Sequence, residues 1–304
     1  MQNRALELSE LAEDLADSRM RLDMLEVPDD DRTAAVRSAF SWSYRALRPA
    51  EDRLFRMLGI LPTGSFSDRA AAALAGQSLV DTRAQLDELV NRHLVGHLDD
   101  GRFRLNDLLR VYAAEQSVIA DPLVDRLRAW QRLLDWYIRT ARSAGRTLNP
   151  GKPRPVEPQL VKRSPGPQPL TSRSAALTWF QTEYASLDYA AKRAFEVEEY
   201  KRAWQLAIGL GDYLFVEQRW QAAIAYYDLG IKAAVRLGDR EPEIRLRVEA
   251  AIVHLFTGGT AQAVAVFAIA RAWAMASGAR SVHALATYGL ALASLVATAP
   301  RQEA

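Results

Sequence analysis

The four histidines are the first candidates for metal chemistry in this chain, because its 304 residues include no cysteine. Without thiols, disulfides, thiolate catalysis and the common structural zinc sites are excluded. His93 and His97 have the i, i+4 spacing that can direct two imidazoles toward a zinc ion. The pair nevertheless straddles a predicted helix end and a predicted strand, and no cysteine accompanies it. We therefore expect no metal site.

The motifs of common catalytic sites are also missing. The sequence has no G-x-S-x-G, and no pair of carboxylates is placed distinctively enough to favour general acid or base catalysis over a solvated surface. It also lacks G-x-x-x-x-G-K-[ST], the loop that cradles phosphates and holds magnesium. Nucleotide hydrolysis is therefore excluded for this polypeptide. We expect no enzyme activity and no cofactor in this chain.

Composition and charge are those of an ordinary globular protein. Apolar residues make up 49% of the chain and charged residues 25%, and the length suffices for two domains. Because 39 basic residues face 37 acidic ones, the formal charge is only +2 and gives no strong attraction to nucleic acid or to an anionic membrane. Acidic residues from Glu7 to Asp17 occupy the place of a secretory signal, so we expect a cytoplasmic protein.

The first part of the chain is predicted to be helical with one β-hairpin. Apolar residues at helical spacing predict helices, in chain order, over 1–26, 33–47, from Pro49, 67–75 and 81–94. Alternating residues on both sides of Asp99-Asp100-Gly101 then predict a hairpin over 94–105, and a closing helix follows over 107–117. Helices followed by a hairpin and a closing helix predict a winged-helix domain at 33–120.

The middle of the chain changes composition abruptly. An amphipathic helix over 125–143 lies in a connecting segment, 121–148, and seven of the 13 prolines then fall between Pro150 and Pro169. Basic residues are interleaved with these prolines, namely Lys152, Arg154, Lys162 and Arg163. Such a stretch is typical of an extended linker, which we place at 149–172. Its charge is expected to serve solvation; a specific nucleic-acid contact is the alternative.

Residues 173–304 repeat with a period of 40. Small residues recur at Gly211, Ala251 and Ala291, and an aromatic residue recurs at Tyr227 and Phe267. The pattern resembles the tetratricopeptide repeat, in which small residues let paired helices approach and an aromatic side chain fills the gap between hairpins. The predicted fold class is therefore mostly α: a winged helix with a small β-hairpin, followed by an α-solenoid of tetratricopeptide-like helical hairpins.

The concave side of these repeats is the expected recognition surface. If the small residues mark the eighth position of each repeat, the first helix of each hairpin directs a mixed aromatic and charged set toward that side. The candidate partner-binding residues are Gln205, Asp212, Phe215, Arg245, Ile252 and Tyr288. Such a set suits a peptide or a small inducer. The alternative is that several of these side chains only pack one hairpin on the next.

Nearly the entire chain resembles the C-terminal part of bacterial STAND regulators of the NB-ARC type, in the actinobacterial SARP-type architecture. The segments that carry the resemblance are Arg21-Leu22, Ala35 to Tyr44, Leu54 to Gly59, Ala71 to Gly76, Gly101 to Arg110, Trp179-Phe180, Arg219-Trp220 and Leu237 to Asp239. Residues 1–32 would then be a helical remnant of the nucleotide-binding module. With the P-loop missing, the chain is either a fragment or a shortened relative.

The resemblance implies a function. In that family a P-loop ATPase core holds ADP, the winged helix closes over the nucleotide, and the repeats sense an inducer or a partner in regulating antibiotic biosynthesis. The ATPase core, with ADP or ATP, would act in cis or in trans, and DNA would be bound only indirectly. A His-Asp pair that lies near the ADP phosphates in that family falls here on Asn106 and Asp107, which become candidate nucleotide-sensing residues. Helix capping by either residue is the alternative.

Two further functions remain as alternatives: a direct DNA-binding winged helix and a plain repeat scaffold. The helix before the wing carries no net charge, and residues 33–117 hold 11 arginines against 10 acidic groups, so a footprint for phosphate neutralisation is missing. The uncharged stretch 284–299 is shorter than a membrane span and favours a buried repeat helix. We expect no membrane partner. Self-association through the helix at 281–299 is expected if no further repeat covers it.

Overall fold

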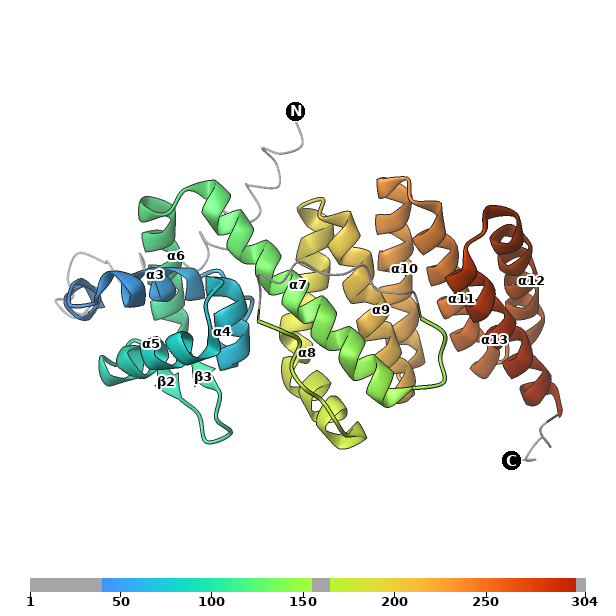
Figure 1. Cartoon of the computed structure of the whole chain (residues 1–304), viewed down its shortest axis with the longest axis horizontal. Coiled ribbons are helices and arrows are strands. Elements are labelled where there is room, and N and C mark those ends of the chain that lie inside the picture. The colour runs from blue at the N-terminus through green and yellow to red at the C-terminus, as the bar shows by residue number, and fades with distance from the viewer. Residues whose placement is uncertain (1–39, 155–164, 299–304) are drawn as a thin grey trace, which may run out of the picture. The chain divides into compact units, whose positions relative to one another are not determined.

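The computed structural model describes residues 40–154 and 165–298, in two compact units. Of the described residues, the N-terminal unit takes in 40–136 and 165–166, and the repeat unit takes in 137–154 and 167–298. The fold class is confirmed as mostly α, with a helical-repeat solenoid and, among the described residues, only a small sheet (Figure 1). The helix predicted at 1–26 lies outside the described residues. The winged-helix assignment and the five-part domain division stay predictions.

Helix boundaries in the N-terminal unit follow local capping. The helices are α3 (Pro49–Leu58), α4 (Asp68–Ala75), α5 (Leu79–Asn91), α6 (Asp107–Ala120) and the first part of α7 (Leu123–Leu148), while residues 40–45 are also helical. Pro49 occupies the first turn of α3, as predicted. The prediction for α5 was two residues late, because the Ser78 hydroxyl accepts the Asp81 N–H and starts the helix earlier. The helix ends at Asn91, just before His93 takes a left-handed backbone conformation with φ 58°.

A three-stranded antiparallel sheet accompanies these helices. Its strands are β1 (Ser65–Phe66), β2 (Gly96–His97) and β3 (Phe103–Arg104), in the order β1-β3-β2. The predicted hairpin of β2 and β3 is confirmed. Strand β1 was not predicted, because two residues are too few to show an alternating pattern. It pairs Phe66 with Phe103, and their rings stack at 6.0 Å between centroids.

Aromatic rings form the centre of the helical part of this unit. The ring of Tyr44 meets Phe55 and Tyr112, each at 5.7 Å between centroids. Burial and the Asp52 carboxylate raise the pKa of Tyr44 to about 12. Arg56 fixes the edge of this cluster, donating two hydrogen bonds to the Asp121 carboxylate at 2.9 and 3.0 Å. This bidentate pair joins the end of α6 to α3.

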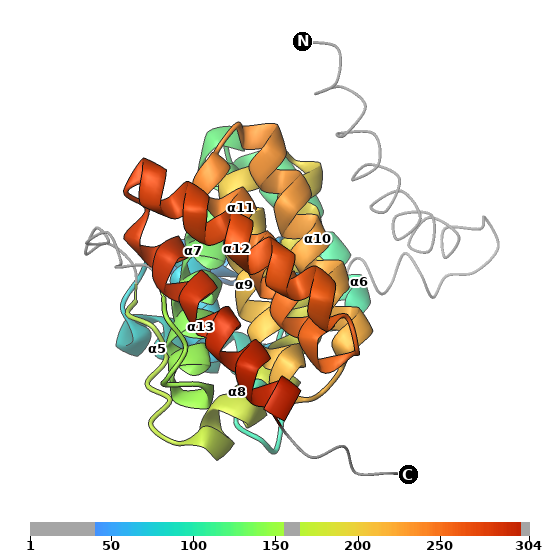
Figure 2. The same cartoon turned by 90° about the vertical axis from the view of Figure 1, so that its right-hand side faces the viewer.

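The repeat unit consists of the last part of α7 and six further helices. These are α8 (Arg173–Glu196), α9 (Tyr200–Val216), α10 (Trp220–Leu237), α11 (Arg240–Phe256), α12 (Thr260–Ser277) and α13 (Arg280–Thr298). Each helix from α8 to α12 contacts the next one in sequence, and α11 also contacts α13 (Figure 2). Left-handed residues end several of them, Gly238 and Gly278 among these, so that the chain reverses within a short turn.

The 40-residue period corresponds to close helix packing. Gly211 of α9 faces the ring of Tyr227 on α10, where an added Cβ would lie 2.4 Å from the ring. The side chain of Phe267 on α12 packs in the same way on Gly289 of α13, in the following hairpin. The aromatic residue therefore spans hairpins at Phe267, as predicted, whereas Tyr227 packs within its own hairpin.

Two helices of the described residues, α12 and α13, are long and apolar enough to cross a membrane by length and composition alone. Both pack within the repeat stack. Phe267 of α12 and Val282, Leu285 and Ala286 of α13 are fully buried in the core that α11 completes. The stretch predicted as a buried repeat helix is thus, up to Thr298, part of this stack.

Candidate functional site

A cluster of buried charges lies inside the repeat unit. Asp212 comes from α9 and Glu249 from α11, and their carboxylates are 8% and 1% exposed. Each lies on the buried face of its helix, so that its side chain turns into the stack rather than toward solvent. Two buried carboxylates are stable as anions only if cations and hydrogen-bond donors face them.

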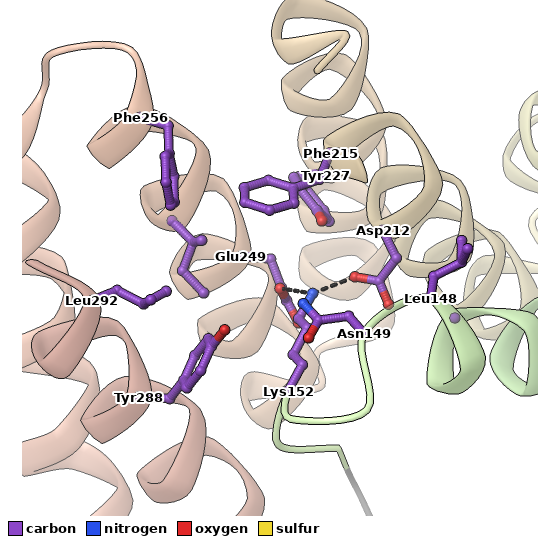
Figure 3. A pocket seen from close by; sticks show the side chains of 12 residues that line it. Leu148, Asn149, Lys152, Asp212, Phe215, Tyr227, Glu249, Phe256, Tyr288 and Leu292 are labelled. Atoms are coloured by element: carbon purple, nitrogen blue, oxygen red, sulfur yellow. Dashed lines mark hydrogen bonds and ion pairs between the residues drawn. The ribbon is translucent and has the colours of Figure 1, made fainter. Parts of the chain in front are cut away.

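The cation between them comes from the segment that follows α7. We call residues 149–154 the strap. Its Lys152 side chain, 9% exposed, places the ammonium between the two carboxylates, bonding to Asp212 and to Glu249, the latter at 2.5 Å (Figure 3). A single lysine thereby joins the strap to α9 and to α11.

Two arginines complete the cluster. Arg154 of the strap donates to Asp212 at 3.2 Å and to the carbonyl oxygens of Gly145 and Asn149, each at 2.8 Å. Arg245, one turn before Glu249 on α11, donates to the Glu249 carboxylate at 3.2 Å and to the Pro153 carbonyl at 3.1 Å. The strap is therefore bound to the repeats by both its side chains and its backbone.

The protonation states of the cluster follow from these contacts. Burial by itself would raise the pKa of the Asp212 carboxyl, but Lys152 and Arg154 hold that pKa below its ordinary value. Burial would lower the pKa of the Lys152 ammonium, yet Asp212 and Glu249 raise it. Burial and the same two carboxylates raise the pKa of Tyr227 well above its ordinary value. At neutral pH, Asp212 and Lys152 are thus charged and Tyr227 is neutral.

A small pocket with a cavity volume of about 70 Å³ adjoins the Lys152 ammonium. Four aromatic side chains line it: Phe215, Tyr227, Phe256 and Tyr288. The rings of Phe215 and Phe256 meet edge to face at 5.4 Å between centroids. Leucine and isoleucine side chains complete the apolar part of the lining, at Leu148, Ile252 and Leu292 (Figure 3). The pocket thus has an apolar body and one charged end.

Four of the six predicted partner-binding residues line this pocket together. They are Asp212, Phe215, Ile252 and Tyr288. Arg245 is in the charge cluster but does not line the pocket, and Gln205 is half-buried on α9 and also outside it. The position of a residue does not by itself show that it binds a partner, so a role in recognition stays a prediction for all six.

Sequence analysis missed Lys152, Arg154, Glu249 and Tyr227 as site residues. The interpretation of the strap's charge as solvation is wrong, because Lys152 and Arg154 are only 9% and 14% exposed and pair with buried carboxylates. The signal that could have found them was in the repeats. Asp212 interrupts an apolar helical stretch and Glu249 adjoins another. A buried acidic side chain requires a basic partner.

The other candidate site lies in the N-terminal unit. Asn106 is the N-cap of α6, and its side-chain oxygen accepts the Leu108 N–H at 2.9 Å. Helix capping, the alternative function of this residue, is therefore confirmed. The Asp107 side chain is 87% exposed and lies 4.0 Å from Arg110. Nucleotide sensing by the two residues stays a prediction.

Within the described ranges, no group of three or more His, Cys, Asp or Glu side chains is placed to hold a metal ion. His93 and His97 are separated as the sequence predicted, with His97 in β2 packing edge to face on Phe103 at 5.2 Å. His93 therefore lies in the turn after α5, and His97 packs within the sheet.

Comparison with known proteins gives relatives but no family. No protein-family model matches the sequence. The chain is similar to Regulatory protein AfsR from Streptomyces griseus, with 33% identity over 264 residues, covering 85% of this chain and 26% of the relative. It is similar to Regulatory protein AfsR from Streptomyces coelicolor, with 36% identity over 203 residues, covering 66% of this chain and 20% of the relative. The chain thus spans about a quarter or less of the length of these curated relatives.

Proposed function

We propose that this chain is a sensing and signal-transducing part of a transcriptional regulator similar to Regulatory protein AfsR. The similarity to the Streptomyces griseus protein, which extends over 85% of the chain at 33% identity, carries this proposal. A match of that length takes in segments of both units, so the proposal concerns the whole described chain rather than one shared motif. Regulation of antibiotic biosynthesis belongs to the proposal through the family resemblance.

In this proposal the repeat unit senses a small inducer or a partner. The pocket beside Lys152 supports it, because apolar walls with a few converging polar groups are typical of ligand sites. The same features offer no nucleophile paired with a base, so the proposed activity is recognition and not catalysis.

The N-terminal unit is proposed to act as a winged-helix gate for a nucleotide-binding core. The arrangement of helices around a small sheet supports this, with the β2–β3 hairpin between α5 and α6. The ATPase core would hold ADP or ATP in cis or in trans, and Asn106 at the start of α6 would lie near the phosphates. DNA would be bound only indirectly.

Transcript profiling tests the proposed function. The source strain, a strain with the gene deleted and a complemented strain are compared by RNA sequencing under one growth condition. We expect a defined set of transcripts to change on deletion and to return on complementation. Unchanged transcripts would contradict a regulatory function. In parallel, the purified chain should give no salt-dependent shift of a generic DNA duplex, whereas a shift would favour the direct DNA-binding alternative.

A further inference from the structure

We propose that the pocket beside Lys152 is built for a small organic anion with an apolar or aromatic body, whose acidic group is received by the Lys152 ammonium. The inference rests on the proposed sensing function and names the chemical class of the ligand. Charge balance, the geometry of Lys152 and the character of the walls support it independently.

The charge cluster holds one more cation than anions. Lys152, Arg154 and Arg245 contribute three positive charges, and Asp212 and Glu249 contribute two negative ones. Each carboxylate already faces two cations: Asp212 meets Lys152 and Arg154, and Glu249 meets Lys152 and Arg245. Since an unbalanced charge is costly to bury, a negative ligand would complete this cluster more favourably than a neutral one.

Unused donors accompany the excess charge. The ammonium of Lys152 has three N–H groups, and two of them are directed at Asp212 and Glu249. The side chain also lines the pocket, so its remaining donor is available to an oxygen of a ligand. Deeper in the cluster, the Nε and Nη1 groups of Arg245 are buried without an acceptor among the described residues. Oε2 of Glu249 is also buried without a hydrogen bond, although the Lys152 ammonium lies 2.5 Å from it, so the unused donors of the cluster outnumber its unused acceptors.

The shape and walls of the pocket favour a small molecule over an extended peptide. Arg154 and Arg245 bind backbone carbonyls of the strap and so hold it against the repeats. The cavity that remains beside it is small, about 70 Å³. Rings of Phe215, Phe256 and Tyr288 around that space match a flat or aliphatic body better than a polar backbone.

Lys152 determines the sign of the charge that the pocket accepts. With lysine in place, the charged end of the pocket is an ammonium group. If that group is removed, Arg154 and Arg245 balance Asp212 and Glu249, and the pocket keeps neither the excess charge nor the ammonium donor. A single substitution should therefore abolish the preference between two ligands that differ only in their charged group.

Isothermal titration calorimetry of the purified chain tests this with three matched probes: phenylbutyrate, phenylbutylamine and phenylbutanol. For the wild type we expect phenylbutyrate to bind about tenfold more tightly than phenylbutanol, as a charge-assisted hydrogen bond replaces a neutral one, and phenylbutylamine to bind most weakly. Lys152→Met should lose the preference for the carboxylate and bind phenylbutyrate no more tightly than phenylbutanol. Lys192→Met, which removes an exposed lysine on α8, is the control and should behave as wild type.

Lys152→Arg keeps the positive charge and should keep the carboxylate preference, which protects the test if Lys152→Met fails to fold by circular dichroism. Equal binding of the three probes to the wild type, no saturable binding, or a carboxylate preference that survives Lys152→Met in a folded protein would overturn the inference. Failure of the proposed function is a separate result, because it is measured by transcript levels on gene deletion and does not depend on these probes.

Discussion

At the scale of single residues, Lys152 is the charged side chain that the strap buries between two carboxylates of the repeat unit. Its ammonium gives up hydration to lie between Asp212 and Glu249, and both carboxylates lose their water as well. Such burial is tolerated because each anion has two cationic partners. Removing the shared cation should therefore weaken the contacts that hold the strap to α9 and to α11.

We predict that Lys152→Met lowers the free energy of unfolding by about 2 kcal/mol at neutral pH, because Arg154 and Arg245 still face the carboxylates. The pKa of Lys152 is raised in the folded protein, so its contribution is fully present below the unfolded pKa of about 10.4 and is lost as the pH rises through the higher folded pKa. The difference in the free energy of unfolding between the variant and the wild type should thus narrow as the pH rises through the folded pKa. Urea titrations at neutral and alkaline pH measure it.

Lys192→Met provides the matched control for this prediction. Lys192 pairs with Asp188 on the same helix face, and its side chain is 60% exposed. Exposed pairs of this kind stabilise proteins little, so this variant should unfold at nearly the wild-type urea concentration. If the two lysine variants lost equal stability, the burial of Lys152 would have no energetic consequence.

Asn106 tests capping against a role in nucleotide sensing. Asn106→Ala should lower the free energy of unfolding of the N-terminal unit by about 1 kcal/mol, because the Leu108 N–H loses its acceptor. Asn106→Asp should keep the cap and the stability. Thermal unfolding of both variants followed by circular dichroism measures this. An alanine variant as stable as the wild type would show that the cap contributes nothing.

At the scale of secondary-structure elements, local signals predicted the helices well. Ser67, whose hydroxyl accepts the Ala70 N–H, and Gly76, with φ 70°, bound α4 where the sequence indicated. These signals act over three or four residues, so one sequence suffices to find them. Strand β1 and the strap were missed because their contacts are distant in sequence. β1 exists only by pairing with β3, and Lys152 is ordered by residues 60 and more positions away.

Close packing between helices gives a prediction at this scale. Replacing a helix-interior glycine by alanine ordinarily stabilises a helix by about 1 kcal/mol. At Gly211 the new Cβ would lie 2.4 Å from the Tyr227 ring, so α9 and α10 would have to separate. We expect Gly211→Ala to lower the free energy of unfolding by about 1–3 kcal/mol.

A second substitution separates this packing effect from helix propensity. In the background of Tyr227→Leu, where the ring is absent, Gly211→Ala should lower the free energy of unfolding by less than it does in the wild type. Chemical denaturation of the four proteins in this cycle gives the coupling energy. An equal cost in both backgrounds would contradict contact with the ring as the cause.

At the scale of the whole molecule, the sequence predicted the mostly helical fold and the side of the repeats that holds a pocket. Asp212, Phe215, Ile252 and Tyr288 came from the repeat period alone, because equivalent positions of successive hairpins face one side. The strap could not be predicted in the same way. Proline-rich sequence lacks periodicity, and its place is determined by buried charges that three separate elements supply.

The central claim, that the repeat pocket controls a transcriptional regulator, is tested most directly in the source strain. RNA sequencing should compare strains that carry Lys152→Met, Lys192→Met or the wild-type gene at its chromosomal position, with protein levels matched by immunoblot. We predict that Lys152→Met shifts the transcripts that respond to gene deletion, whereas Lys192→Met leaves them at wild-type levels. Wild-type transcript levels in the Lys152→Met strain, at equal protein abundance, would contradict the claim.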